Sequence, residues 1–263
     1  MLAPLTTDWS DFDPNEYLRE YYSDLGSENL ALLRHHHEAY QGVPPDSMLL
    51  DFGGGPTIYS LIAAADRVRE IHVSDYVEAN LAELRRWLRA EVGAFDWRPF
   101  IEKTLELETG RLCSSHDVAQ REVAIRRRVT RLLRSDAART PPIVGGPSSY
   151  DVVVSNFCAE SATSDRAQWR AFMQNIASLV KPRGKLITAA LAGARSYSVG
   201  SKAFPAVDIA ADDLIEVLEE CDFPEKSIAV RSVRADRPTR HYRGLILAVA
   251  TRDAGSNGAC GPC

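Results

Sequence analysis

The sequence predicts an α/β fold in which a mostly parallel sheet carries helices on both faces. An apolar strand at Met48–Leu50 is followed by an aspartate, three consecutive glycines and a helix over Thr57–Ala65. A second strand, Glu70–Ser74, also ends at an aspartate, and Tyr150–Asn156 has the continuous apolar character of a strand buried on both faces. Strands that alternate with helical segments are typical of parallel sheets built from crossover connections.

Capping signals and apolar spacing predict the remaining elements. Asp13, Pro14 and Glu16 form a capping box and predict a short helix that ends near Ser23. The basic segment from Arg121 to Arg139 is expected to hold a helix that runs directly into another strand. Further helices are expected over 28–40, 78–91, 166–180 and 210–221, a strand over 185–192, and a closing antiparallel pair over 226–233 and 242–251.

Composition restricts the class of protein. A chain of 263 residues with 45% apolar content can bury one sizeable core, so a single compact fold is expected. The 36 acidic residues outnumber the 31 basic ones, which disfavours nucleic acid as a partner. The sequence has neither a signal-peptide start nor eighteen consecutive apolar residues, so a cytoplasmic protein without a membrane partner is expected.

No metal site is expected. The triplet His35-His36-His37 lies in a predicted helix, where adjacent side chains point in different directions and do not chelate one ion.

The glycine turn after the first strand predicts a nucleotide-like ligand. Gly53, Gly54 and Gly55 let a ligand approach the main chain where a Cβ would block it. Asp75, at the end of the second strand, is placed to accept hydrogen bonds from ribose hydroxyls. The dinucleotide fingerprint is incomplete, because Ile58 stands where its third glycine would be. These anchors suit either a nicotinamide dinucleotide or S-adenosylmethionine, and the residues alone leave both open.

Five further motifs carry a family resemblance. They are Asp13-Pro14-Asn15-Glu16-Tyr17-Leu18 with Tyr21-Tyr22, Leu50-Asp51 through Gly55-Pro56-Thr57-Ile58-Tyr59, Ser74-Asp75-Tyr76 with Asn80-Leu81, Ala94-Phe95-Asp96-Trp97, and Leu179-Val180-Lys181-Pro182. Together they resemble the nicotinamide N-methyltransferase family, which also holds phenylethanolamine N-methyltransferase and the amine- and thioether-methylating enzymes. The similarity runs, with gaps, from about Asp11 to Thr251.

The resemblance implies a Rossmann-like class I methyltransferase fold. In that fold a seven-stranded, mostly parallel sheet has an antiparallel last strand and helices on both faces. It also implies a helical lid over residues 1–46, a methyltransferase domain over 47–252 and S-adenosylmethionine as cofactor. The glycine-rich residues 253–263, which end in Cys260-Gly261-Pro262-Cys263, are expected to form a flexible tail.

The resemblance also implies a reaction. We expect in-line methyl transfer to a small molecule, most simply to the nitrogen of an amine or pyridine-like acceptor, by a monomer. Methylation of a small thiol is the alternative. An NAD-dependent oxidoreductase and a cofactor-binding protein without catalysis are further alternatives.

Carried onto this sequence, the family pattern implies a set of cofactor-binding residues. They are Tyr17, Tyr22, Gly53, Gly54, Gly55, Thr57, Tyr59, Asp75, Tyr76, Asn80, Asp136, Ala137, Asn156 and Phe157. Asp136 and the backbone N–H that follows it are expected to hold the adenine edge. Electron-rich tyrosine rings near a sulfonium centre are favourable through cation–π attraction.

The same pattern implies the acceptor end of the site. Tyr17, Glu160 and His241 are the expected catalytic residues, and the expected substrate-binding residues are Cys158, Glu160, Ala190, Ala194 and Tyr197.

The acceptor pattern departs from its relatives at four positions. Ala190, Ala194 and Ala206 replace the polar residues that hold the nicotinamide carboxamide, and Gly193 replaces the glutamate of the catecholamine branch. Nicotinamide is therefore not the expected acceptor, and a less polar molecule is predicted.

Overall fold

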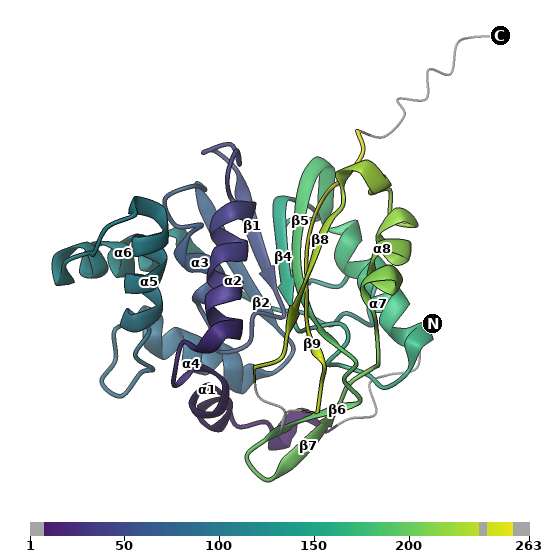
Figure 1. Cartoon of the computed structure of the whole chain (residues 1–263), viewed down its shortest axis with the longest axis horizontal. Coiled ribbons are helices and arrows are strands. Elements are labelled where there is room, and N and C mark those ends of the chain that lie inside the picture. The colour runs from purple at the N-terminus through teal and green to yellow at the C-terminus, as the bar shows by residue number, and fades with distance from the viewer. Residues whose placement is uncertain (1–7, 237–240, 255–263) are drawn as a thin grey trace.

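The computed structural model of the chain describes residues 8–236 and 241–254 (Figure 1). Its helices are η1 (Trp9–Asp11), α1 (Pro14–Tyr22), α2 (Gly26–Ala39), α3 (Tyr59–Ile62), α4 (Glu78–Leu88), α5 (Arg98–Thr109), α6 (Ser115–Arg128), α7 (Arg166–Ser178), α8 (Ala211–Glu219) and η2 (Glu225–Ser227). Its strands are β1 (Met48–Phe52), β2 (Glu70–Asp75), β3 (Val129–Arg134), β4 (Tyr150–Asn156), β5 (Val180–Ala192), β6 (Ser196–Val199), β7 (Lys202–Pro205), β8 (Ala229–Arg234) and β9 (Gly244–Thr251). The predicted tail residues 255–263, with Cys260 and Cys263, lie outside the described residues.

One seven-stranded sheet organises the chain, with the strand order β3-β2-β1-β4-β5-β9-β8. Strands β1 to β5 pair in parallel, whereas β9 is antiparallel to both of its neighbours. This confirms the predicted mostly parallel sheet with an antiparallel last strand. The strand order reverses between β1 and β4, and in open α/β sheets ligands bind beyond the carboxyl ends of the strands at such a point.

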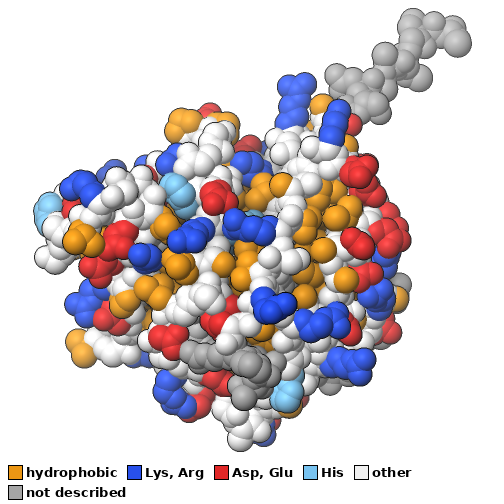
Figure 2. Space-filling view, in the orientation of Figure 1, with side chains coloured by type: hydrophobic (Ala, Val, Ile, Leu, Met, Phe, Trp, Pro, Cys, Tyr) orange, Lys and Arg blue, Asp and Glu red, His pale blue; other side chains and the backbone are white. Residues whose placement is uncertain are grey.

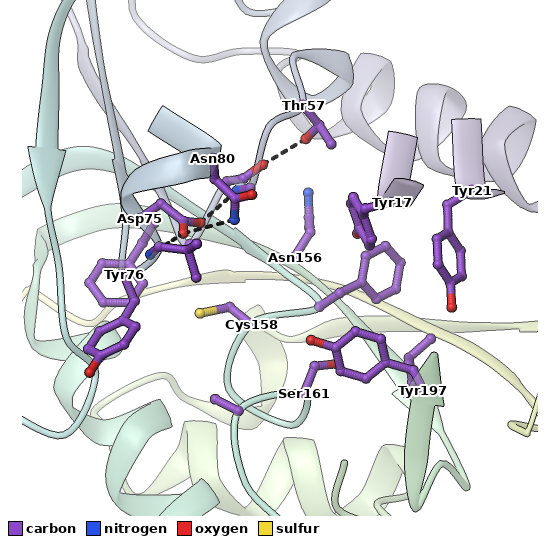
Figure 3. A pocket seen from close by; sticks show the side chains of 18 of the residues that line it. Tyr17, Tyr21, Thr57, Asp75, Tyr76, Asn80, Asn156, Cys158, Ser161 and Tyr197 are labelled. Atoms are coloured by element: carbon purple, nitrogen blue, oxygen red, sulfur yellow. Dashed lines mark hydrogen bonds between the residues drawn. The ribbon is translucent and has the colours of Figure 1, made fainter. Parts of the chain in front are cut away.

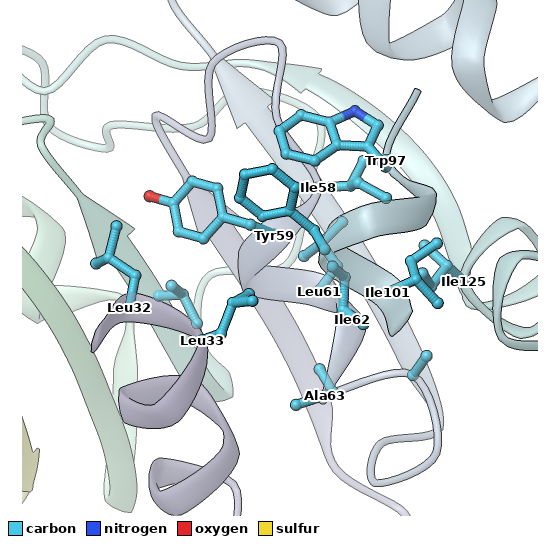
Figure 4. Close-up of a cluster of buried hydrophobic side chains, with 14 of the residues drawn as sticks. Leu32, Leu33, Ile58, Tyr59, Leu61, Ile62, Ala63, Trp97, Ile101 and Ile125 are labelled. Carbon is cyan, nitrogen blue, oxygen red and sulfur yellow. The ribbon is translucent and has the colours of Figure 1, made fainter. Parts of the chain in front are cut away.

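Two apolar cores cover the two faces of the sheet. Because successive strand residues point to opposite faces, Leu49 belongs to the core that α2, α3, α5 and α6 complete, whereas Leu50 belongs to the core under α7 and α8. Figure 4 shows the first core, where Trp97 and Ile58 pack above Leu61 and Ile62. Helix α2 therefore covers a sheet face, although it falls within the predicted lid.

The observed elements depart from the predicted ones in three places. The helix predicted over Thr57–Ala65 is only the single turn α3, and the Thr57 hydroxyl closes the turn before it by donating to Gly54 O at 2.7 Å. Helix α5 was not predicted; its apolar stripe includes Phe100 and Ile101, and Gly110 ends it in the left-handed conformation. The β6–β7 hairpin was also not predicted, and it packs beside α1.

The surface is mixed in charge. Figure 2 shows acidic and basic side chains interspersed over one face of the described residues. None of the described helices has both the length and the apolar character that a membrane-spanning segment needs.

Candidate active site

A pocket opens beyond the carboxyl ends of β1, β2 and β4, where the strand order reverses. The cavity has a volume of about 160 Å³. Figure 3 shows Asp75 and Tyr76 on one side, the tyrosine rings of α1 and β6 on the other, and Cys158 between them. The predicted site residues that line it are Tyr17, Tyr22, Gly53, Gly54, Gly55, Thr57, Tyr59, Asp75, Tyr76, Asn80, Ala137, Asn156, Phe157, Cys158 and Tyr197.

The glycine turn brings main-chain atoms to the pocket surface. Gly53 has φ +67°, and the amides of Gly53 and Gly54 both donate to Ser74 O, at 2.8 and 3.1 Å. A Cβ on Gly53 would overlap Cys158 Sγ, and one on Gly54 would lie 2.9 Å from Asp51 Oδ2. Only glycine fits at these two positions without displacing Cys158 or Asp51.

Asp75 is oriented by three donors of its own chain. Its Oδ2 accepts from Gly55 N at 2.8 Å, and its Oδ1 accepts from Val77 N at 2.8 Å and from Asn80 Nδ2 at 3.1 Å. Burial raises the pKa of Asp75, and these hydrogen bonds act in the opposite direction. The carboxylate is therefore held in one orientation before any ligand arrives.

Two amide oxygens in the pocket wall lack a donor. Asn80 Oδ1 and Asn156 Oδ1 are buried, and neither has a hydrogen-bond partner among the described residues. Leaving a buried acceptor unsatisfied costs about 1–3 kcal/mol, so each oxygen favours a ligand that brings a donor.

Aromatic side chains of α1 and β6 line the side of the pocket opposite Asp75. The ring of Tyr17 lies 5.0 Å from that of Tyr21 and 5.7 Å from that of Tyr22. Tyr21 donates to Ser198 O of the hairpin at 2.8 Å, which joins α1 to β6. Burial raises the pKa of Tyr17, Tyr22 and Tyr197 well above 10, so these phenols are neutral.

A family match follows this geometry. The model of the NNMT/PNMT/TEMT family matches residues 3–253. The chain belongs to this family. Nicotinamide N-methyltransferase of Sus scrofa is 30% identical over 253 residues, which cover 92% of this chain and 94% of the relative. Indolethylamine N-methyltransferase of Mus musculus is 36% identical over 206 residues, which cover 75% of this chain and 76% of the relative.

Solved structures confirm the fold. A SAM-dependent methyltransferase from Methanosarcina mazei has a TM-score of 0.54 at 14% identity and covers 80% of this chain and 94% of its own. DhpI in complex with SAH has a TM-score of 0.54 at 12% identity and covers 91% of each chain. This NNMT/PNMT/TEMT family member is a methyltransferase with the class I fold, and its cofactor is S-adenosylmethionine.

The pocket fits that cofactor. Asp75 offers an oriented carboxylate to ribose hydroxyls, the Gly53 turn has no side chain to obstruct the sulfonium arm, and Asn156 offers an unpaired oxygen to an ammonium.

Two expected residues of this methyltransferase turn away from the pocket. The Asp136 carboxylate accepts from Ala138 N at 2.9 Å and from Arg139 Nε at 3.1 Å, so it caps its own turn, whereas the adjacent Ala137 lines the pocket. His241 is exposed, and the following residue, Tyr242, lines the pocket instead.

Two of the expected substrate-binding residues, Ala190 and Ala194, do not line the pocket. Ala190 points into the core under α7 and α8, because alternate residues of a strand face opposite ways, and Leu191 lines the pocket. Ala194 is fully buried outside the pocket lining.

Glu160 lies directly behind the lining. Its Oε1 accepts from Leu191 N at 3.0 Å and from Ser161 Oγ at 3.4 Å, and Leu191 and Ser161 both line the pocket.

Sequence reasoning missed the other lining residues of the methyltransferase pocket. They are Trp9, Phe12, Tyr21, Glu28, Asn29, Leu32, Phe52, Val77, Ser135, Ser161, Ala162, Leu191, Tyr242 and Leu245. Tyr242 donates to Glu28 Oε2 at 2.7 Å across 214 residues of chain, and no local motif announces such a contact. A signal existed for Tyr21, which shares its helix with Tyr17 and Tyr22.

Two buried carboxyl groups should make the stability depend on pH. Burial raises the pKa of Asp51 and of Glu160 to about 7. Between their ordinary values and pH 7 the folded state binds more protons than the unfolded state, so the free energy of unfolding should fall as the pH rises through this range. The slope is at most about 1.4 kcal/mol per pH unit for each group.

Chemical denaturation between pH 4.5 and 7.5 measures this slope. Asp51→Asn and Glu160→Gln should each make the decline shallower, because an amide does not titrate. Glu91→Gln, at an exposed side chain, is the matched control and should keep the wild-type slope. Parallel curves for all four proteins would contradict the prediction.

Proposed function

We propose that this methyltransferase transfers a methyl group to the nitrogen of a small, largely apolar acceptor, an amine or a pyridine-like ring. One observation carries the proposal: the same cavity is lined at one end by Gly53 and Asp75 and at the other end by aromatic rings. The relatives named as nicotinamide and indolethylamine N-methyltransferases support a nitrogen acceptor. The apolar side chains Leu191 and Leu245 in the lining support one that is less polar than nicotinamide.

The proposed mechanism is positioning of two bound reactants with exclusion of water. When bound, S-adenosylmethionine supplies a methyl group on a sulfonium, which a lone pair can displace. Asp75 and the glycine turn would hold the cofactor, and Tyr17, Tyr21 and Tyr197 would orient the acceptor. Their neutral rings keep water away and stabilise cationic centres through their faces. We propose that the lid consists of residues 8–22 together with the β6–β7 hairpin.

Glu160 is the proton acceptor that we propose, in place of the exposed His241. Burial raises the pKa of Glu160 to about 7, so its carboxylate is available near neutral pH. Ser161 lies between Glu160 and the pocket and can pass a proton to Glu160 from the ammonium form of an amine acceptor, or from a thiol, before either attacks the methyl group.

Incubation with methyl-labelled S-adenosylmethionine and a panel of pyridines, arylalkylamines and small thiols tests the function. Label should appear on apolar nitrogen acceptors, and nicotinamide should be a poorer substrate than an unsubstituted pyridine. Label on thiols alone would establish the sulfur alternative. Cofactor binding in calorimetry without transfer to any acceptor would indicate a binding protein, and NADH fluorescence changes on mixing would indicate an oxidoreductase.

Glu160→Gln should slow the methylation of acceptors that must lose a proton and should not slow the methylation of acceptors that carry none. A pyridine nitrogen carries no proton, whereas a primary amine must release one. The ratio of amine to pyridine methylation should therefore fall about tenfold or more in this variant. The measurement is kcat/KM for one acceptor of each kind at pH 8. An unchanged ratio would remove Glu160 from the proposed mechanism.

A further inference from the structure

The middle histidine of the triplet lies against the pocket wall. His36 is fully buried in α2, and its Nε2 lies 3.0 Å from Asn156 Nδ2 at the end of β4. His35 is buried but does not contact Asn156, and His37 is partly exposed and contacts Gln41. The described residues hold no group of three or more His, Cys, Asp and Glu side chains that could hold a metal ion.

The contact determines which atoms carry hydrogen. In the amide orientation of the structure Asn156 Nδ2 faces His36 Nε2; an amide nitrogen only donates, so Nε2 accepts and the ring proton lies on Nδ1. Burial and the neighbouring His35 lower the pKa of His36 well below 6.5, so the ring is neutral and keeps its accepting lone pair.

His36 is a poor choice for stability alone. Its Nδ1 is buried and has no hydrogen-bond partner among the described residues. A leucine at this place would bury no unsatisfied N–H and has the better helix propensity. The histidine is therefore better explained by what it does to Asn156.

The consequence for Asn156 is a fixed amide. With Nδ2 directed at His36, Oδ1 is the remaining polar atom of the side chain, and it is the buried oxygen without a partner. While the ring proton is on Nδ1, a flipped amide would place Oδ1 against the lone pair of Nε2, and two acceptors repel each other. If the proton moved to Nε2, the flipped amide would present its N–H donors to the ammonium, which has no lone pair to accept them.

Strand register places this oxygen relative to Asp75. Leu50 pairs with Val153 and Asp51 with Val154, and two further residues bring Asn156 level with Gly53. On the other side Phe52 pairs with Ser74, which brings Asp75 level with Gly53. The two side chains are thus two strand spacings apart, about 10 Å.

We propose that His36 is a positioning residue that fixes the Asn156 amide so that its oxygen accepts from the ammonium of the amino-acid arm of the cofactor. This inference rests on the cofactor site described above. It assigns no contact between His36 and the cofactor itself, because the histidine acts through Asn156.

Calorimetric binding of two ligands separates the inference from a general disturbance of the pocket. S-Adenosylhomocysteine carries the amino-acid arm, whereas 5′-methylthioadenosine carries the same nucleoside without it. His36→Leu should lower the affinity for S-adenosylhomocysteine about ten- to hundredfold, because a hydrogen bond to a charged group is lost. The affinity for 5′-methylthioadenosine should stay within about twofold of the wild-type value. The thermal midpoint should change by no more than about 3 °C.

Three further variants sharpen the test. His36→Gln should restore most of the affinity, because its amide oxygen reaches about as far as Nε2 and can accept from Asn156. Asn156→Ala should reproduce the loss, and adding His36→Leu to it should cause no further loss. His37→Leu is the matched control in the same helix and should bind both ligands as the wild type does.

Equal weakening of both ligands by His36→Leu, or no weakening of either, would overturn the inference. If the wild type bound neither ligand, the cofactor site itself would be wrong, which is a different outcome. If His36→Leu did not fold, His36→Gln and Asn156→Ala would still decide: undiminished affinity for S-adenosylhomocysteine in Asn156→Ala, or a ten- to hundredfold loss in His36→Gln, would overturn it.

Discussion

Replacing Asp75 with alanine should lower the affinity for S-adenosylmethionine at least about a hundredfold. A hydrogen bond to a charged acceptor is worth about 1.5–3 kcal/mol, and two ribose hydroxyls would lose theirs together. The amides of Gly55 and Val77 would lose the same acceptor, so the turn that shapes the pocket would loosen as well.

Isothermal calorimetry on the purified variant measures this effect. Asp96→Ala removes an exposed carboxylate paired with Arg98, outside the pocket lining, and serves as the control that should bind normally. Asp75→Asn should lie between the alanine variant and the wild type, because it keeps one acceptor oxygen without the charge. Wild-type affinity in Asp75→Ala would reject the ribose site.

Replacing Gly53 with alanine should be the most damaging single-methyl change in the pocket. The new Cβ would overlap Cys158 Sγ and lie 2.8 Å from Cys158 Cβ, and an L-residue at φ +67° is strained. Left-handed backbone costs about 1–2 kcal/mol and overpacking about 1–3 kcal/mol. The free energy of unfolding should therefore fall by about 2–5 kcal/mol, and cofactor binding should be lost.

Gly55→Ala separates the two causes. Gly55 also has positive φ, at +61°, but nothing lies within 4 Å of its Cβ position, so only the backbone cost of about 1–2 kcal/mol applies. Combining Gly53→Ala with Cys158→Gly should recover the packing part of the loss. Urea denaturation of the three variants measures both terms, and an equal loss in the two single-glycine variants would refute the packing argument.

The fold was predictable because its signals are local. The strand, the glycine turn and the acid at the end of the next strand follow one another within thirty residues, and their backbone chemistry allows few alternatives. Helix α5 was not predicted, although its segment carries two local signals: Pro99 lies in its first turn and Gly110 ends it.

The errors in the site have a different cause. Whether Ala190 or Leu191 faces the pocket depends on the phase of β5, and a shift of one residue exchanges the two faces. The Asp136 carboxylate binds Arg139 because that partner is only three residues away, and a resemblance at one position does not reveal it. Tyr242 and Glu28 meet only in the folded chain.

The two unpaired amide oxygens have a consequence for engineering. Asn80 and Asn156 each hold a buried acceptor that the chain itself leaves unsatisfied, so the ligand-free enzyme is less stable than its packing allows. A screen for heat resistance alone would select apolar replacements at both places. The selected variants would unfold at a higher temperature and bind the cofactor less tightly. Asn80 and Asn156 therefore give this enzyme a trade-off between stability and activity.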